Sequence, residues 1–173
     1  DQAVELLGTH KPGGPYRGNK YSAYEAGTRV PTIVYWPGKI AATESDALLT
    51  QTDLYASFAE LIGHKLNEEE AGDSYAMWDS FSGKTKKGRE FMLEESVTLS
   101  IRHGNFKYIH PTKKKASWIK DQKNIESGIS PKPQLYDLSN DIGERHNIAG
   151  EKEKLVKKMQ AEIERIKNNQ ISR

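Results

Sequence analysis

The sequence contains no cysteine, so no disulfide can form. This absence leaves the redox compartment of the protein undecided, because nothing in the chain needs oxidising or protecting. Long apolar runs are also missing, and none approaches the roughly 20 residues that a membrane-spanning helix requires. The sequence therefore predicts no transmembrane segment and no association with a membrane.

An excess of charge of one sign is lacking as well. Lysine and arginine number 26 against 24 acidic residues, which gives a formal net charge of +2. So small an excess argues against a nucleic-acid-binding protein, which would hold its partner through many phosphate contacts. The N-terminal residues have neither the basic region nor the apolar stretch of a signal peptide, so we expect any export signal to lie outside this chain.

Metal-binding patterns are absent too. No segment gathers the several oxygen ligands that a hard divalent cation needs, and no two histidines have ligand spacing on a helix. The sequence predicts no metal site within the chain. Hydrophobic residues at 35% and charged residues at 29% of 173 residues indicate a soluble chain of one domain, or one domain with a small appendage.

The first half of the chain has an α/β pattern. Residues Thr32–Trp36 are β-branched or aromatic and are followed by a Pro-Gly turn, which predicts a short buried strand. Thr50–Asp53 matches a capping box and Gly63 a left-handed stop, so we predict a helix from about Thr52 to Ile62. Its apolar face would consist of Leu54, Phe58, Leu61 and Ile62.

The second half changes to short strands. Four strand-like runs follow one another: Phe91–Glu94, Val97–Arg102, Phe106–Ile109 and Gln134–Leu138. The tripeptide His103-Gly104-Asn105 between the second and third runs predicts a hairpin turn. From Glu151 onward apolar residues recur at helical spacing, which predicts a terminal amphipathic helix that covers one face of the sheet.

One lysine, Lys20, stands in a glycine-rich bend before the Thr32–Trp36 run. The glycines at positions 13, 14, 18 and 27 permit positive φ and close approach of the main chain to a ligand. A lysine held there is a point positive charge with three hydrogen-bond donors, which suits an anionic tetrahedral oxygen group. The bend is therefore the leading candidate for a functional site.

The bend resembles the signature of the type I sulfatases, the arylsulfatase-like branch of the alkaline phosphatase superfamily. Members commonly read Gly-Pro-x-Arg-Gly-x-Lys-x-x-x-Tyr-Glu-x-Gly-x-Arg-Val-Pro, as residues 14–31 do here. Gly88–Phe91, Ile101–Ile109 and Leu135–Asn147 resemble the C-terminal subdomain of these enzymes. The resemblance implies the end of the large α/β domain over residues 1–87. An antiparallel four-stranded subdomain with a C-terminal helix would follow over residues 88–173.

The resemblance also implies a cofactor and a nucleophile. These enzymes hydrolyse sulfate esters with a calcium ion and a formylglycine made from a Cys/Ser-x-Pro/Ala-x-Arg motif. This chain has neither that motif nor the Asp-Asn pair that binds calcium; Ser57–Leu61 comes nearest but ends in leucine within a helical pattern. We therefore expect a C-terminal fragment that is inactive alone, with calcium and formylglycine supplied by the missing N-terminal part of the same protein.

By the same resemblance, the bend carries the site residues. Lys20 would stay protonated, contact a sulfate oxygen and stabilise the charge that grows on the leaving ester oxygen. His10, just before the bend, could contact the substrate, and Arg17 could either reach an anion or tie down the loop. We interpret Glu25 and Arg29, at i and i+4, as an ion pair that braces the bend.

Two other functions stay open at this point. The same tetrahedral-anion pocket could serve a phosphoester or phosphonate hydrolase of the superfamily. The connection from Pro111 to Pro133 carries lysines from Lys113 to Lys123 around Trp118, which could grip an anionic polysaccharide in a non-catalytic module or form a plain solvated loop. The expected partner is a sulfated small molecule or glycan rather than nucleic acid, and family resemblance implies a periplasmic or extracellular location.

Overall fold

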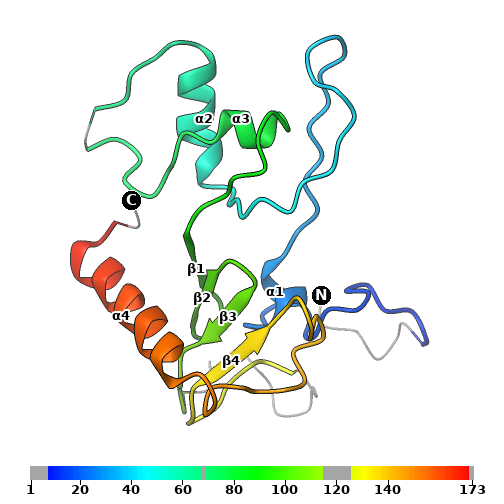
Figure 1. Cartoon of the computed structure of the whole chain (residues 1–173), viewed down its shortest axis with the longest axis vertical. Helices are drawn as coiled ribbons and strands as arrows, with labels where there is room; N and C mark the ends of the chain where they lie inside the picture. The colour runs from blue at the N-terminus through cyan, green and yellow to red at the C-terminus, as the bar shows by residue number, and fades with distance from the viewer. Residues whose placement is uncertain (1–7, 68, 115–125, 172–173) are drawn as a thin grey trace. The chain divides into compact units, whose positions relative to one another are not determined.

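The structure is a computed structural model that describes residues 8–67, 69–114 and 126–171 (Figure 1). The chain divides into two compact units, one formed by Asp1–Val30 with Leu93–Ile163 and the other by Pro31–Met92 with Glu164–Arg173. The glycine-rich bend thus belongs to the same unit as most of the second half of the chain. The predicted division into domains 1–87 and 88–173 stays a prediction.

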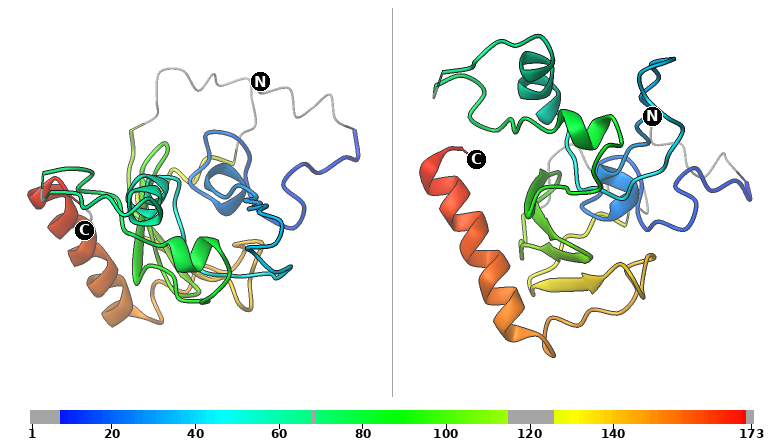
Figure 2. Two further views of the ribbon diagram at one scale, coloured as in Figure 1. Left: turned by 90° about the horizontal axis from the view of Figure 1, so that it is seen from above. Right: turned by 45° about the horizontal axis from the view of Figure 1, so that its top comes forward.

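The first unit is built on a four-stranded sheet with the order β1-β2-β3-β4 (Figures 1 and 2). The strands are β1 (Phe91–Glu95), β2 (Leu99–His103), β3 (Phe106–Ile109) and β4 (Gln134–Asp137). β2 pairs antiparallel with β3, and His103 lies opposite Phe106, so Gly104 and Asn105 alone form the turn. Gly104 has φ +55°, the left-handed conformation that such a hairpin turn needs. The predicted four-stranded antiparallel sheet is confirmed, with β2 shifted along the chain from its predicted bounds.

Helix α4 (Glu153–Asn169) lies alongside this sheet (Figures 1 and 2). Met159 and Ile163, one helical turn apart, are fully buried. Near the start of the helix, Lys158 Nζ lies 3.2 Å from His103 Nε2 at the end of β2. The predicted terminal amphipathic helix is confirmed, and together with the sheet it makes the mixed α/β architecture expected from the sequence.

The bend contributes to the core of this unit. Ala23 and Tyr24 are buried in one hydrophobic cluster with Ile109 of β3 and Tyr136 of β4. The Tyr24 and Tyr136 rings meet edge to face with their centroids 6.0 Å apart. The residues next to Lys20 are therefore anchored in the core that the sheet forms.

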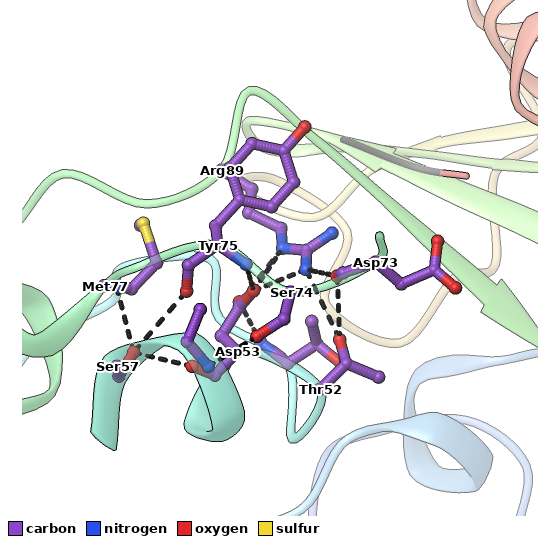
Figure 3. A network of polar contacts seen from close by, with 10 residues as sticks. Thr52, Asp53, Ser57, Asp73, Ser74, Tyr75, Met77 and Arg89 are labelled. Atoms are coloured by element: carbon purple, nitrogen blue, oxygen red, sulfur yellow. Dashed lines mark hydrogen bonds and ion pairs between the residues drawn. The ribbon is translucent and has the colours of Figure 1, made fainter. Parts of the chain in front are cut away.

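The second unit contains helices α2 (Asp53–Leu61) and α3 (Trp78–Phe81), which pack on each other. Asp53, fully buried at the start of α2, binds Arg89, whose Nε lies 2.9 Å from Oδ2 (Figure 3). The same carboxylate accepts from the backbone N–H groups of Tyr75 at 2.9 Å and Thr50 at 3.1 Å. The bond to Thr50 is one half of the predicted capping box. No helix in the described residues has the length and apolar character needed to cross a membrane.

One prediction for the second unit is wrong, while the predicted helix from about Thr52 to Ile62 is confirmed as α2. Thr32–Trp36 forms no strand, and Ile33 and Tyr35 are 91% and 84% exposed. On the predicted apolar face of α2, Phe58 is 50% exposed, and Ile62, just after the helix, is 78% exposed. A strand needs a neighbour for its backbone hydrogen bonds, and within the described residues no segment pairs with this run. The composition of Thr32–Trp36 indicates a tendency to form a strand, but it cannot show whether a neighbouring strand is present to pair with it.

Candidate functional site

The bend around Lys20 is a tight turn that leads into helix α1 (Glu25–Thr28). The N–H of Ser22 donates to the carbonyl of Asn19 at 2.9 Å, which makes Lys20 and Tyr21 the central residues of the turn. Tyr21 adopts φ +76°, a left-handed conformation that is rare for a residue with a side chain. Lys20 is therefore presented at the tip of a turn with a defined backbone.

Two glycines allow the bend to pack on itself. A Cβ at Gly27 would lie 2.1 Å from the carbonyl oxygen of Ser22, and a Cβ at Gly18 would lie 2.3 Å from Ser22 Oγ. Neither position has room for any side chain. In this structure, the close main-chain approach that the glycines permit is an approach of the bend to itself.

Segments from the second half of the chain hold the tip of the turn. Ser22 Oγ donates to the carbonyl of Glu126 at 2.6 Å, and Ser96 Oγ donates to the carbonyl of Tyr21 at 2.7 Å. Ser22 is fully buried. The two residues that follow Lys20 are thus fixed by partners far away in the sequence.

Arg17 ties the bend down from its other side. Its Nε lies 3.0 Å from Glu126 Oε1, its Nη1 donates to the carbonyl of Glu144 at 2.7 Å, and its guanidinium lies 4.1 Å from the centre of the Tyr24 ring. Of the two roles that the sequence left open for Arg17, the anchoring one has these contacts. A contact of Arg17 with substrate stays a prediction.

Lys20 and His10 are both exposed. Lys20 Nζ lies 5.0 Å from the centre of the Tyr21 ring, so the ammonium group stands over the neighbouring side chain and faces solvent. Among residues 8–67, no hydrogen bond or ion pair joins His10 to Lys20 or Arg17. The structure therefore brings the exposed Lys20 and the anchoring Arg17 onto one bend, and the roles of Lys20 and His10 toward substrate stay predictions.

Buried charges adjoin the bend in the core of the first unit. We call them the buried charge cluster; its members are Glu25, Glu94, Arg102, Lys107 and Glu144. Lys107 on β3 is fully buried, and its Nζ lies 3.0 Å from Glu25 Oε1 and 2.7 Å from Glu94 Oε2. Arg102 on β2 donates to Glu25 Oε2 at 3.0 Å. The first residue of α1 is thus held by two strands of the sheet.

The expected ion pair of Glu25 with Arg29 is confirmed, with Arg29 Nη1 3.5 Å from Glu25 Oε2. The contacts of Glu25 with Lys107 and Arg102 were missed in the sequence analysis, because those residues lie about 80 positions further along the chain. The sequence singles out Glu144 only as part of Leu135–Asn147, the segment that resembles the C-terminal subdomain of type I sulfatases. The one local signal was a lysine, Lys107, within an otherwise apolar strand.

The pKa values within the cluster are perturbed in different directions. Burial disfavours the charged form of Lys107, but Glu94 and Glu25 outweigh burial and raise its pKa. Burial also opposes ionisation of Glu25, yet Lys107 and Arg102 outweigh it and lower the pKa of Glu25. For Glu144 burial dominates and raises the pKa to about 7, although Lys107 acts in the opposite direction. Glu144 therefore titrates near neutral pH.

The implied calcium ion has no fitting set of ligands in the part of the chain that the structure describes. There, no group of three or more His, Cys, Asp or Glu residues is arranged to hold a metal ion. The lysine-rich connection is described only up to Lys114 and again from Glu126, so the predicted polysaccharide-binding residues around Trp118 lie outside the described residues.

Comparison with known proteins gives consistent matches. A family model described as Sulfatase matches residues 5–64. The N-acetylgalactosamine-6-O-sulfatase of Bacteroides thetaiotaomicron is 42% identical over 96% of this chain and 33% of that protein. A solved structure from work on the metabolism of multiple glycosaminoglycans by Bacteroides thetaiotaomicron has 41% identity and a TM-score of 0.88, over 97% of this chain and 35% of that one.

A further solved structure is that of Ps i-CgsB in complex with k-i-k-neocarrahexaose. It has 26% identity and a TM-score of 0.65, over 87% of this chain and 31% of that chain. The chain thus spans about a third of the length of the proteins and structures that it matches.

Proposed function

Because this chain belongs to the sulfatase family, we propose that it provides the Lys20 bend of an enzyme that hydrolyses sulfate esters. The observation that carries the proposal is the placement of Lys20: the two residues that follow it are held by Glu126 and Ser96, while its ammonium group faces solvent. A positive charge that is already in position before the reaction stabilises a developing negative charge, because the protein does not have to reorganise in the transition state. Lys20 would contact a sulfate oxygen and stabilise the leaving ester oxygen.

For the substrate we propose a sulfated glycan. The relative with 42% identity is named an N-acetylgalactosamine-6-O-sulfatase. The solved structure with 41% identity comes from work on the metabolism of multiple glycosaminoglycans. A more distant structural match holds a neocarrahexaose. His10 and Arg17, which precede Lys20 in the same segment, are proposed as additional substrate contacts. We also propose that the protein is periplasmic or extracellular, because a sulfated glycan substrate would be met outside the cytoplasm.

The nucleophile and the calcium ion are proposed to come from sequence that this chain does not contain. Formylglycine and calcium together would supply the attacking oxygen and neutralise the sulfate charge. What supports this is that the chain spans only about a third of the length of the proteins that it matches. We therefore expect this chain alone to hydrolyse no sulfate ester.

The test uses the intact enzyme that carries this sequence. Lys20→Ala should lower kcat/KM for a 6-O-sulfated N-acetylgalactosamine substrate by about a hundredfold or more, because a preorganised donor is lost. Lys84→Ala is the matched control, since Lys84 is 66% exposed and pairs only with the equally exposed Asp79 in its described contacts. An unchanged rate for Lys20→Ala, or faster hydrolysis of the matching phosphate ester by the wild type, would contradict the proposal.

A further inference from the structure

Glu144 accepts hydrogen bonds from the bend on both sides of Lys20. Its carbonyl oxygen accepts a hydrogen bond from Arg17 Nη1 at 2.7 Å, and its carboxylate Oε2 accepts from the backbone N–H of Glu25 at 2.8 Å. Arg17 precedes Lys20 in the sequence and Glu25 follows it. A single residue from a distant turn therefore holds the segment that carries Lys20 at both of its ends.

The backbone around Glu144 is constrained for this task. Glu144 has φ +52°, which costs energy for a residue with a side chain. Its N–H donates to the carbonyl of Asp141, and the Asp141 carboxylate accepts from the N–H groups of Arg145 at 2.8 Å and His146 at 2.7 Å. The turn is thus fixed independently of the bend, and it can act as a support for it.

The surroundings of Glu144 do not favour a carboxylate for stability. The side chain is fully buried, and its Oε1 has no hydrogen-bond partner among the described residues. The charged or titratable groups that act on it are Lys107 from β3, Glu25 from α1, Glu94 from β1 and Tyr136 from β4. Two of these groups are carboxylates, and a buried charge that is only partly compensated is costly. Stability alone therefore does not account for a glutamate here.

We propose that Glu144 is a positioning residue for Lys20, which sets where the ammonium group stands by fixing Arg17 and Glu25. The inference rests on the proposed function, because the position of Lys20 affects the rate only if Lys20 contacts the substrate. Displacing a catalytic group by about 1 Å can cost on the order of a hundredfold in rate. Glu144 acts without touching the substrate itself.

A double-mutant cycle in the intact enzyme tests this role. Glu144→Ala removes the acceptor for the Glu25 N–H and should lower kcat/KM by roughly tenfold or more, whereas Glu144→Gln keeps an oxygen in that place and should stay within about threefold of the wild type. In a Lys20→Ala background, Glu144→Ala should cause no further loss, because the group that it positions is gone. Glu164→Ala is the control, since Glu164 is 45% exposed and pairs with Lys167 on α4.

Each outcome has a distinct meaning. If the losses of Lys20→Ala and Glu144→Ala multiply in the double variant, Glu144 does not act through Lys20 and the inference is wrong. Equal losses in Glu144→Gln and Glu144→Ala would also overturn it. An unchanged rate for Lys20→Ala alone would instead reject the role of Lys20 and the inference with it. If circular dichroism shows that Glu144→Ala does not fold, Glu144→Asp, which withdraws the carboxylate by one methylene, takes its place in the same cycle.

Discussion

Glu144 should make the stability of the fold depend on pH in an unusual direction. Its pKa is raised from 4.5 to about 7 by burial, so between these pH values the folded state holds a proton that the unfolded state has lost. Because protonated Glu144 favours the folded state, its contribution to the free energy of unfolding is fully present below pH 4.5. That contribution is lost as the pH rises through 7. At about 1.4 kcal/mol per pKa unit, the full contribution is roughly 3 kcal/mol.

The perturbation that isolates this effect is Glu144→Gln, which cannot ionise. Between pH 5.5 and 8.5 the wild type should lose roughly 2 kcal/mol of unfolding free energy relative to the variant, as the linkage relation gives for these two pKa values. The five histidines and the other titratable groups that do not interact with Glu144 are common to both proteins, so their contributions cancel in the difference, and what remains reports Glu144 together with its neighbours Lys107, Glu25 and Glu94.

Urea unfolding followed by circular dichroism at pH 5.5, 7.0 and 8.5 measures this difference. As the pH rises, the unfolding free energy of the wild type should fall relative to that of Glu144→Gln by the roughly 2 kcal/mol given above. Parallel curves over the whole range would show that Glu144 has the same pKa in the folded and unfolded states. A curve in which the wild type gains relative stability with pH would show that Lys107 outweighs burial at this site and would refute the reasoning.

Two further substitutions probe the packing around Lys20. Lys107→Met should lower the unfolding free energy by roughly 3 to 5 kcal/mol, because it removes the buried cation that pairs with Glu94 and one of the cations that pair with Glu25. The exposed control Lys84→Met should change the unfolding free energy by less than about 1 kcal/mol in the same urea titration. Gly27→Ala should force the bend open, since its Cβ would lie 2.1 Å from the Ser22 carbonyl; lower kcat/KM and a lower melting temperature are expected, and Gly150→Ala, whose Cβ meets nothing within 4 Å, should be neutral in both assays.

Local chemistry made much of the first unit predictable. The hairpin turn after β2 and the helical spacing from Leu155 to Ile163 depend on neighbouring residues, and the structure contains both, with the turn narrowed to Gly104 and Asn105. Thr32–Trp36 failed because a strand depends on a partner that sequence pattern does not reveal. The buried charge cluster was out of reach for a similar reason, since the contact of Lys107 with Glu25 spans 82 positions.

The candidate site shows the same division between local and distant causes. The glycine pattern around Lys20 predicted a tight bend, and the structure contains one. What holds that bend is remote, because Ser96, Glu126 and Glu144 come from the second half of the chain. The antiparallel sheet therefore also supports the bend. It provides Lys107, which pairs with Glu25, and the apolar residues among which Tyr24 is buried. If Lys20 has the proposed role, a substitution in β3 would move Lys20 without approaching the substrate. Its effect on rate would then be separated from a loss of folding only by measuring stability and kcat/KM on the same variant.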